Sequence, residues 1–203
     1  MLTVITAATN RQLTTPDRVK AILGVDASDA RLAFLIDTAT SSIEGFCNRV
    51  FAQQTVRQTM CGSGARAILS QAPVTTITAV TLDGQPLGQD DYSLEGDALY
   101  RMRRGVRALW QGRALVVDYV GGYTLPSDEQ GAAWTLPASV ERAAMLLVAA
   151  AVSSTGRDPL LKSENVQGVG SFSYAAPGST STGGLGHGEA EALLARFEMP
   201  VVA

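Results

Sequence analysis

Few side chains in this sequence could do chemistry, and they do not form a catalytic pattern. His187 is the one histidine and lies between Gly186 and Gly188, where nothing would hold an imidazole in place for base catalysis. We interpret it as a solvated linker residue. Cys47 and Cys61 lack the spacing of a zinc site, so we expect both to be buried free thiols, with one disulfide between them as the alternative. The sequence therefore predicts a protein that is not an enzyme and that needs no metal or cofactor.

The charged side chains that stand out form two adjacent clusters of opposite sign. The acidic cluster consists of Asp90, Asp91, Glu95 and Asp97. The basic cluster consists of Arg101, Arg103, Arg104, Arg107 and Arg113. Three interpretations are open: an ordinary charged loop, a contact between the basic cluster and the acidic cluster of a neighbouring subunit, or a contact with DNA phosphates in a channel. Trp110 in the same loop favours an interface, because aromatic side chains anchor binding patches.

The composition is that of a globular chain whose main partner is not nucleic acid. Of its 203 residues, 46% are apolar and 17% are charged, and a net charge of −3 argues against a protein that mainly holds phosphate backbones. The longest apolar run, residues 143–152, is much shorter than the roughly twenty residues that a membrane-spanning helix needs. The N-terminus has no basic region before an apolar one. We therefore expect no membrane contact, and two unpaired thiols fit a reducing cytoplasm.

Three segments have the apolar spacing of core helices. Thr15, Pro16 and Gly24 supply an N-cap, a first-turn proline and a stop, and predict a short helix over residues 15–24. Apolar side chains recur every three to four residues over residues 28–49, which predicts a longer helix packed on one side only. Residues 138–152 predict a helix that is apolar almost all round. Such a helix is either central to its own fold or buried between subunits.

Between these helices, residues 51–123 change to short extended runs separated by turn signals. Asp83-Gly84 is the strongest hairpin signal. The connections are too short for crossover helices, so the sheet is expected to be antiparallel. The predicted fold class is α+β, with a helical core of about four helices, an inserted small antiparallel β region and an extended C-terminal segment. We expect residues 1–152 to form a single domain.

Residues 153–203 predict an extended arm, a glycine-rich linker over residues 178–188 and a short terminal helix over residues 189–197. A linker that ends in a small apolar helix delivers that helix to a partner, or the helix folds back onto its own core. If the arm and helix contact a partner, the predicted contact residues are Lys162, Glu164, Phe172, Tyr174, Leu193, Leu194 and Phe197.

The order of these elements resembles a known family, the head-tail connector (adaptor) proteins of long-tailed bacteriophages. The resemblance covers about residues 15–174. It rests on the two N-terminal helices, the second ending in IEGFCNR, followed by APVTTI, the Asp83-Gly84 turn, VDYVGGY, Leu136-Pro137 and the apolar helix.

The resemblance implies a structural protein of the virion neck that assembles in the host cytoplasm. It implies a dodecameric ring beneath the portal, which extends the DNA channel and offers a docking platform to a downstream connector or tail protein. On this hypothesis the helical core makes the ring, residues 162–174 latch a neighbour or the portal, and the terminal helix anchors after assembly. The alternatives are a tail-completion or terminator protein on the tail side of the joint, and a small hydrolase that uses a serine or cysteine.

Overall fold

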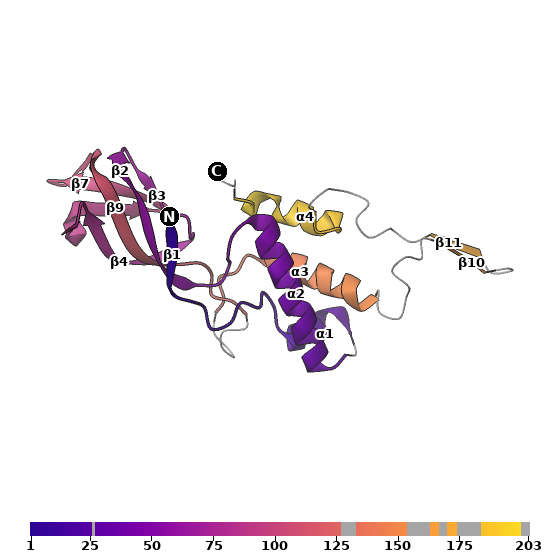
Figure 1. Ribbon diagram of the computed structural model, residues 1–203. Helices are drawn as coiled ribbons and strands as arrows, with labels where there is room; N and C mark the ends of the chain where they lie inside the picture. The colour runs from indigo at the N-terminus through magenta and orange to yellow at the C-terminus, as the bar shows by residue number, and fades with distance from the viewer. Residues whose placement is uncertain (26, 127–132, 154–162, 167–169, 174–183, 200–203) are drawn as a thin grey trace. The chain divides into compact units, whose positions relative to one another are not determined.

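The chain folds into two compact units, each built from two separate stretches of sequence. The computed structural model describes residues 1–25, 27–126, 133–153, 163–166, 170–173 and 184–199 (Figure 1). The β unit consists of Met1–Asn10 and Val50–Thr124, and the helical unit of Arg11–Arg49 and Leu125–Ala203. The β region is thus an insertion between the second and third helices, and the predicted α+β class is confirmed.

The described helices of the helical unit begin and end close to the predicted residues. They are α1 (Pro16–Leu23), α2 (Asp29–Cys47), α3 (Ala138–Ser153) and α4 (Gly188–Leu194), the last followed by a 3-10 turn over Ala195–Phe197. The Thr15 hydroxyl accepts a hydrogen bond from the Arg18 amide at 3.3 Å and caps α1. Gly24 ends that helix in the left-handed conformation, with φ of 63°.

The apolar character of α3 is explained by its neighbours. α3 packs against α1, α2 and α4, so three sides of this helix are covered within one chain. Its Val140, Ala143, Ala144 and Val148 side chains are fully buried. Of the two predicted environments, the structure therefore places this helix at the centre of its own helical unit.

A partly buried ion pair joins α1 to α3. The Arg18 guanidinium donates two hydrogen bonds to Glu141, from Nε to Oε1 at 2.6 Å and from Nη2 to Oε2 at 3.0 Å. The buried Thr14 hydroxyl donates to the same Oε1 at 3.2 Å. Arg18 also lies 4.4 Å over the ring of Trp134. Glu141 is 6% exposed, so these partners compensate for its removal from water.

The β unit contains two antiparallel sheets. Along the first the order is β1 (Leu2–Thr6), β2 (Gln54–Gly64), β9 (Trp110–Gly121), β4 (Val74–Leu82) and β5 (Gln85–Pro86). Along the second it is β3 (Ala67–Ile68), β7 (Ala98–Arg103) and β6 (Tyr92–Glu95), with β8 (Val106–Ala108) also paired to β7 and a 3-10 turn over Gln89–Asp91 before β6. The antiparallel prediction is confirmed, but β1, β5 and β8 were not among the predicted strands.

The core of the β unit contains a polar network centred on Gln58. Tyr119 is fully buried, and its hydroxyl donates to Gln58 Oε1 at 2.8 Å and accepts from the Gln71 amide at 3.0 Å. Gln58 also accepts from the Ser70 amide at 2.8 Å and donates to the Ile68 carbonyl at 3.0 Å. Burial raises the pKa of Tyr119, which keeps the phenol protonated as the donor. This network ties β2 and β9 to the chain that follows β3.

Glycine is required where β9 ends. A Cβ on Gly121 would lie 2.0 Å from the Gln71 carbonyl oxygen, and Gly122 has φ of 110° with the Ala52 carbonyl 2.4 Å from its Cβ position. The backbone therefore approaches too closely for any side chain at these two positions. The Asp83-Gly84 turn is also confirmed, with φ of 50° and 82° between β4 and β5.

Candidate interaction surfaces

The acidic and basic clusters lie on the second sheet of the β unit, where several of their members pair with each other. Arg101 Nη1 lies 2.5 Å from the Asp91 carbonyl oxygen and 3.2 Å from its Oδ1. Arg107 pairs with Glu95 and lies 4.2 Å over the Tyr100 ring. Strand pairing of β6 and β8 with β7 brings these residues together. Because these charges are already paired within one chain, they are less available to form ion pairs with a neighbouring subunit.

The part of the basic cluster that projects from the unit is the turn between β7 and β8. Arg103 pairs with Val106 in the strand register, so Arg104 and Gly105 form a two-residue turn with φ of 53° and 77°. Arg103 and Arg104 are exposed and form no ion pair with the described residues. Val106 is 68% exposed beside them. This turn, called the basic turn below, presents two guanidinium groups and an apolar side chain to a partner.

The remaining members of the clusters are also at the surface. Asp90, Asp97 and Arg113 are exposed. The amides of Arg113 and Ala114 donate to Asp83 Oδ1 at 2.8 and 2.9 Å, and these bonds lower the pKa of the Asp83 carboxyl. Arg113 thus lies beside the β4–β5 turn and away from the β7–β8 turn in the strand order.

The expectation that Trp110 lies in a loop and anchors an interface is wrong. Trp110 begins β9 and is 2% exposed, and its Nε1 donates to the Leu99 carbonyl at 3.1 Å. The side chain belongs to the core of the β unit with Leu99 and Leu115. Because its ring is buried and its single donor is satisfied, Trp110 stabilises the fold and is not available to a partner.

The terminal helix folds back onto its own helical unit. Ala190 and Leu194 of α4 are fully buried, and α4 packs against α3 (Figure 1). Arg142 pairs with Glu189 at 2.7 Å, and the Met199 amide donates to the Cys47 carbonyl at 2.9 Å. Leu194 is therefore a core residue in this structure and not an exposed contact.

Two other predicted contact residues, Leu193 and Phe197, are only half-buried. They remain candidates for a partner surface. Glu164 and Phe172 are paired opposite each other in a hairpin formed by β10 (Ser163–Val166) and β11 (Gly170–Ser173). Lys162 and Tyr174 lie outside the described residues, as does most of the predicted linker over residues 178–188.

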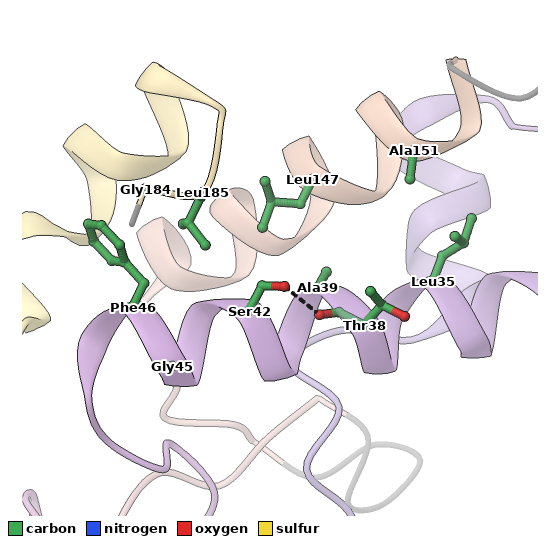
Figure 2. Close-up of a pocket in the computed structure, with 10 residues that line it drawn as sticks. All are labelled: Leu35, Thr38, Ala39, Ser42, Gly45, Phe46, Leu147, Ala151, Gly184 and Leu185. Carbon is green, nitrogen blue, oxygen red and sulfur yellow. Dashed lines mark hydrogen bonds between the residues drawn. The ribbon is translucent and has the colours of Figure 1, made fainter. Parts of the chain in front are cut away.

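A groove of about 490 Å³ runs along the helical unit between α2, α3 and the segment before α4 (Figure 2). Its walls include Leu35, Phe46, Leu147 and Leu185. The Ser42 hydroxyl donates to the Thr38 carbonyl at 2.9 Å, and the Thr38 hydroxyl donates to the Phe34 carbonyl at 2.9 Å. Both donors are satisfied by their own helix, and the groove combines aliphatic and aromatic side chains with polar lining atoms.

The groups considered for catalysis have structural roles. His187 is half-buried rather than solvated, and its Nδ1 accepts from the Ala190 amide at 3.3 Å, so it caps α4. Cys47 is buried, and burial raises its pKa to about 11, which disfavours the thiolate. Cys61 is free but exposed, contrary to the expectation that both thiols are buried. It lies on β2, where alternation turns it away from the core.

Among the described residues, no three His, Cys, Asp or Glu side chains gather where they could hold a metal ion. Within the same residues, no helix is long and apolar enough to cross a bilayer. The described surface presents guanidinium groups at the basic turn and aliphatic and aromatic side chains in the groove.

No protein-family model matches this chain, and no curated protein matches it significantly. Solved structures do match. A chain in the neck of an empty gene transfer agent particle, computed with C6 symmetry, aligns with a TM-score of 0.58 and 19% identity over 100% of this chain and 97% of that chain. A chain in the neck of the native particle, computed with C12 symmetry, aligns with a TM-score of 0.56 and 20% identity over the same shares.

The chain shares its fold with a protein of a phage-like neck. A third match, in the virion of the native gene transfer agent particle, has a TM-score of 0.57 and 18% identity over 100% of this chain and 97% of that chain. The predicted resemblance to neck connector proteins is thus confirmed at the level of the fold. Because the likeness covers both units and nearly the whole of each matched chain, it is not limited to one small shared motif.

Sequence reasoning missed two surfaces. The groove is invisible in the sequence because it forms only when α2 and α3 pack. β1 carries a local strand signal that a sequence analysis could have used. Four of its five residues, Thr3 to Thr6, are β-branched, and such residues favour strands. Its partner, β2, lies about fifty residues further along the chain, so the pairing itself cannot be read locally.

Proposed function

We propose that this chain is a structural subunit of the neck of a phage-like particle, a head-tail connector or adaptor that assembles as a ring under the portal. One observation carries the proposal: the whole chain matches neck chains in structures computed with C6 and C12 symmetry. In this role the ring is a dodecamer that extends the DNA channel and offers a docking platform to a downstream connector or tail protein. The protein is assembled in the host cytoplasm and remains in the virion neck.

The described surfaces supply what a ring subunit needs. A ring closes through head-to-tail contacts, which require two different and complementary patches on each subunit. The groove of the helical unit is a candidate for one such patch. We assign one set of ring contacts to the helical unit, and a further contact, with the portal or a neighbouring subunit, to the hairpin formed by β10 and β11.

The basic turn is the proposed contact with DNA in the channel. Arg103 and Arg104 are exposed and are not neutralised by the acidic cluster, in contrast to Arg101 and Arg107. Two arginines per subunit, repeated around a ring, would bind phosphates without reading sequence. The test is the double variant Arg103→Ala with Arg104→Ala, compared with Arg113→Ala as the matched control. Loss of packaged DNA with intact rings in the double variant alone supports the DNA contact, whereas loss of ring assembly assigns the turn to a subunit contact.

The proposed function is tested by co-sedimentation with the portal ring encoded in the same genome, followed by electron microscopy of the complex. A layer of this protein stacked on the portal is the expected result. Binding to tail-tube protein in preference to the portal would contradict the adaptor role and support a tail-completion or terminator protein. Absence of the protein from purified particles would contradict both.

A further inference from the structure

The first sheet of the β unit has an open edge at β1. β1 pairs with β2 on one side, and no described strand pairs with its other side. The Met1 amine and carbonyl both bond to Thr59, at 2.7 and 2.9 Å. In an antiparallel ladder the residues next to such a pair direct their amide and carbonyl groups the other way. The backbone groups of Leu2 and Val4 therefore face the open side.

The same two residues leave apolar surface uncovered. Leu2 lies opposite Gln58 and Val4 opposite Val56, so their side chains share the face of the sheet that holds the core. Gln58 and Val56 are 7% and 0% exposed, whereas Leu2 and Val4 are 42% and 48% exposed. The core face of the sheet thus continues onto β1 without a cover. A strand added here would pair with the backbone and bury both side chains.

β1 lacks most of the features that protect edge strands from pairing, although a register shift follows Val4 in its ladder to β2. Such strands in soluble proteins carry lysine, proline or inward-facing charge, or they are very short. β1 is Leu-Thr-Val-Ile-Thr, five residues with no charge and no proline. On the other side of the same sheet, β5 pairs only with Thr81 and Leu82, and the rest of β4 is an edge whose ladder to β9 shifts register twice. Over residues 2–4, before its own register shift, β1 is an uncharged edge that can accept a strand.

The chain also contains an isolated strand pair that a further strand would stabilise. β10 and β11 form a two-stranded sheet with no further strand among the described residues. A two-stranded hairpin is at best marginally stable in water, because it buries little surface. Residues 154–162 and 174–183 join it to α3 and to the segment before α4. At about 3.3 Å per residue, connections of this length can span up to roughly 30 Å, enough for the hairpin to reach a neighbouring copy.

We propose that the hairpin formed by β10 and β11 of one copy adds to the β1 edge of a neighbouring copy and joins the two sheets. The contact uses two different patches, the hairpin and β1, which is the head-to-tail geometry that closes a ring. The inference rests on the proposed ring function and specifies one of its subunit contacts. Backbone pairing supplies the affinity, and Leu2 and Val4 become covered.

Disulfide trapping tests the pairing directly. In a background with Cys61→Ser, one tagged variant carries Val4→Cys, and a second set carries a single cysteine at each position of β10 or of β11. Neighbouring strands lie about 4.8 Å apart, within reach of a disulfide, whereas the far strand of the hairpin lies about 10 Å away. Mixed, oxidised samples should give cross-chain products with alternate positions of one hairpin strand and none with the other.

The trapping is performed both on the concentrated purified chain and on particles that contain the variants. No cross-chain product from any position in either sample overturns the proposal. Products only within one chain, or a Val4→Cys homodimer in place of the mixed product, overturn it as well. If the protein is absent from particles, the proposed function fails, while trapping of the purified chain still decides the strand pairing.

A backbone variant separates pairing from packing. Val4→Pro removes an amide that faces the open side and leaves the ladder to β2 intact, whereas Val4→Ala keeps the amide and shortens the side chain. We expect Val4→Pro to reduce trapping at the identified position by about tenfold, as the loss of one hydrogen bond at each contact implies, and Val4→Ala to reduce it less. Equal trapping in Val4→Pro and the parent, with the fold retained by circular dichroism, would refute a β-strand contact.

Discussion

The ion pair between Arg18 and Glu141 is expected to be one of the largest single polar contributions to the stability of the helical unit. Glu141 is 8% exposed at its side chain and Arg18 31%, and the carboxylate accepts from Arg18 twice and from the buried Thr14 hydroxyl once. Removing one partner of a fully buried pair costs about 3–5 kcal/mol. Because Arg18 keeps some water, we expect Glu141→Leu to lower the free energy of unfolding by about 2–3 kcal/mol. Glu141→Gln retains an acceptor oxygen and should cost roughly half as much.

Urea denaturation followed by circular dichroism at 222 nm measures this loss in the helices. The midpoint should fall while the slope of the free energy with urea stays constant. Glu189→Gln is the matched control, because its pair with Arg142 is more than half exposed on both sides and should contribute less than about 0.5 kcal/mol. A double variant of Glu141→Leu with Arg18→Met should recover part of the loss, since no charge is left unpaired. A loss below about 0.5 kcal/mol in Glu141→Leu, equal to that of the control, would refute the reasoning.

Three further predictions concern stability. Burial raises the pKa of Cys47 from 9.0 to about 11, so the unfolded chain loses this proton first, and stability should fall as pH rises from 9 to 11. Comparing the unfolding midpoints of the wild type and Cys47→Ala across that range isolates the thiol, and identical slopes would contradict it. Leu194→Ala should lower the free energy of unfolding by about 2–5 kcal/mol and make α4 sensitive to limited proteolysis, because Leu194 is fully buried. An unchanged stability and cleavage rate would contradict the packing of α4 on α3. Gly121→Ala should destabilise the chain by more than about 2 kcal/mol, because its Cβ would overlap the Gln71 carbonyl. Gly45→Ala is the control: a Cβ there meets nothing within 4 Å, so thermal unfolding should show a neutral or stabilising effect. Equal effects of the two variants would contradict the close approach at Gly121.

The helices could be predicted well because their signals are local. The Thr15 cap, Pro16 and the Gly24 stop act within one or two turns, and the apolar period of α2 is independent of its partner. The Asp83-Gly84 turn is equally local, since both residues must adopt positive φ. The terminal helix was also expected, although whether it packed on its own chain was open.

The fate of individual charged and aromatic residues could not be predicted, because it depends on strand register. Trp110 follows an arginine-rich stretch in the sequence, but the alternation of β9 turns it into the core. Arg101 and Arg107 were candidates for a neighbour, but the pairing of β6, β7 and β8 brings Asp91 and Glu95 within reach of them. A shift of one residue in that register would reverse which groups are exposed.

The sequence by itself determined the α+β class, the order of the elements and the boundaries of the helices, because propensity, capping and turn chemistry act over a few residues. Only the tertiary structure decided which surfaces stay open. Burial of α4 depends on its packing against α3, the groove on the packing of α2 with α3, and the free edge of β1 on a partner strand about fifty residues away. Exposure is a property of packed neighbours, and neighbours distant in sequence are chosen by the fold as a whole.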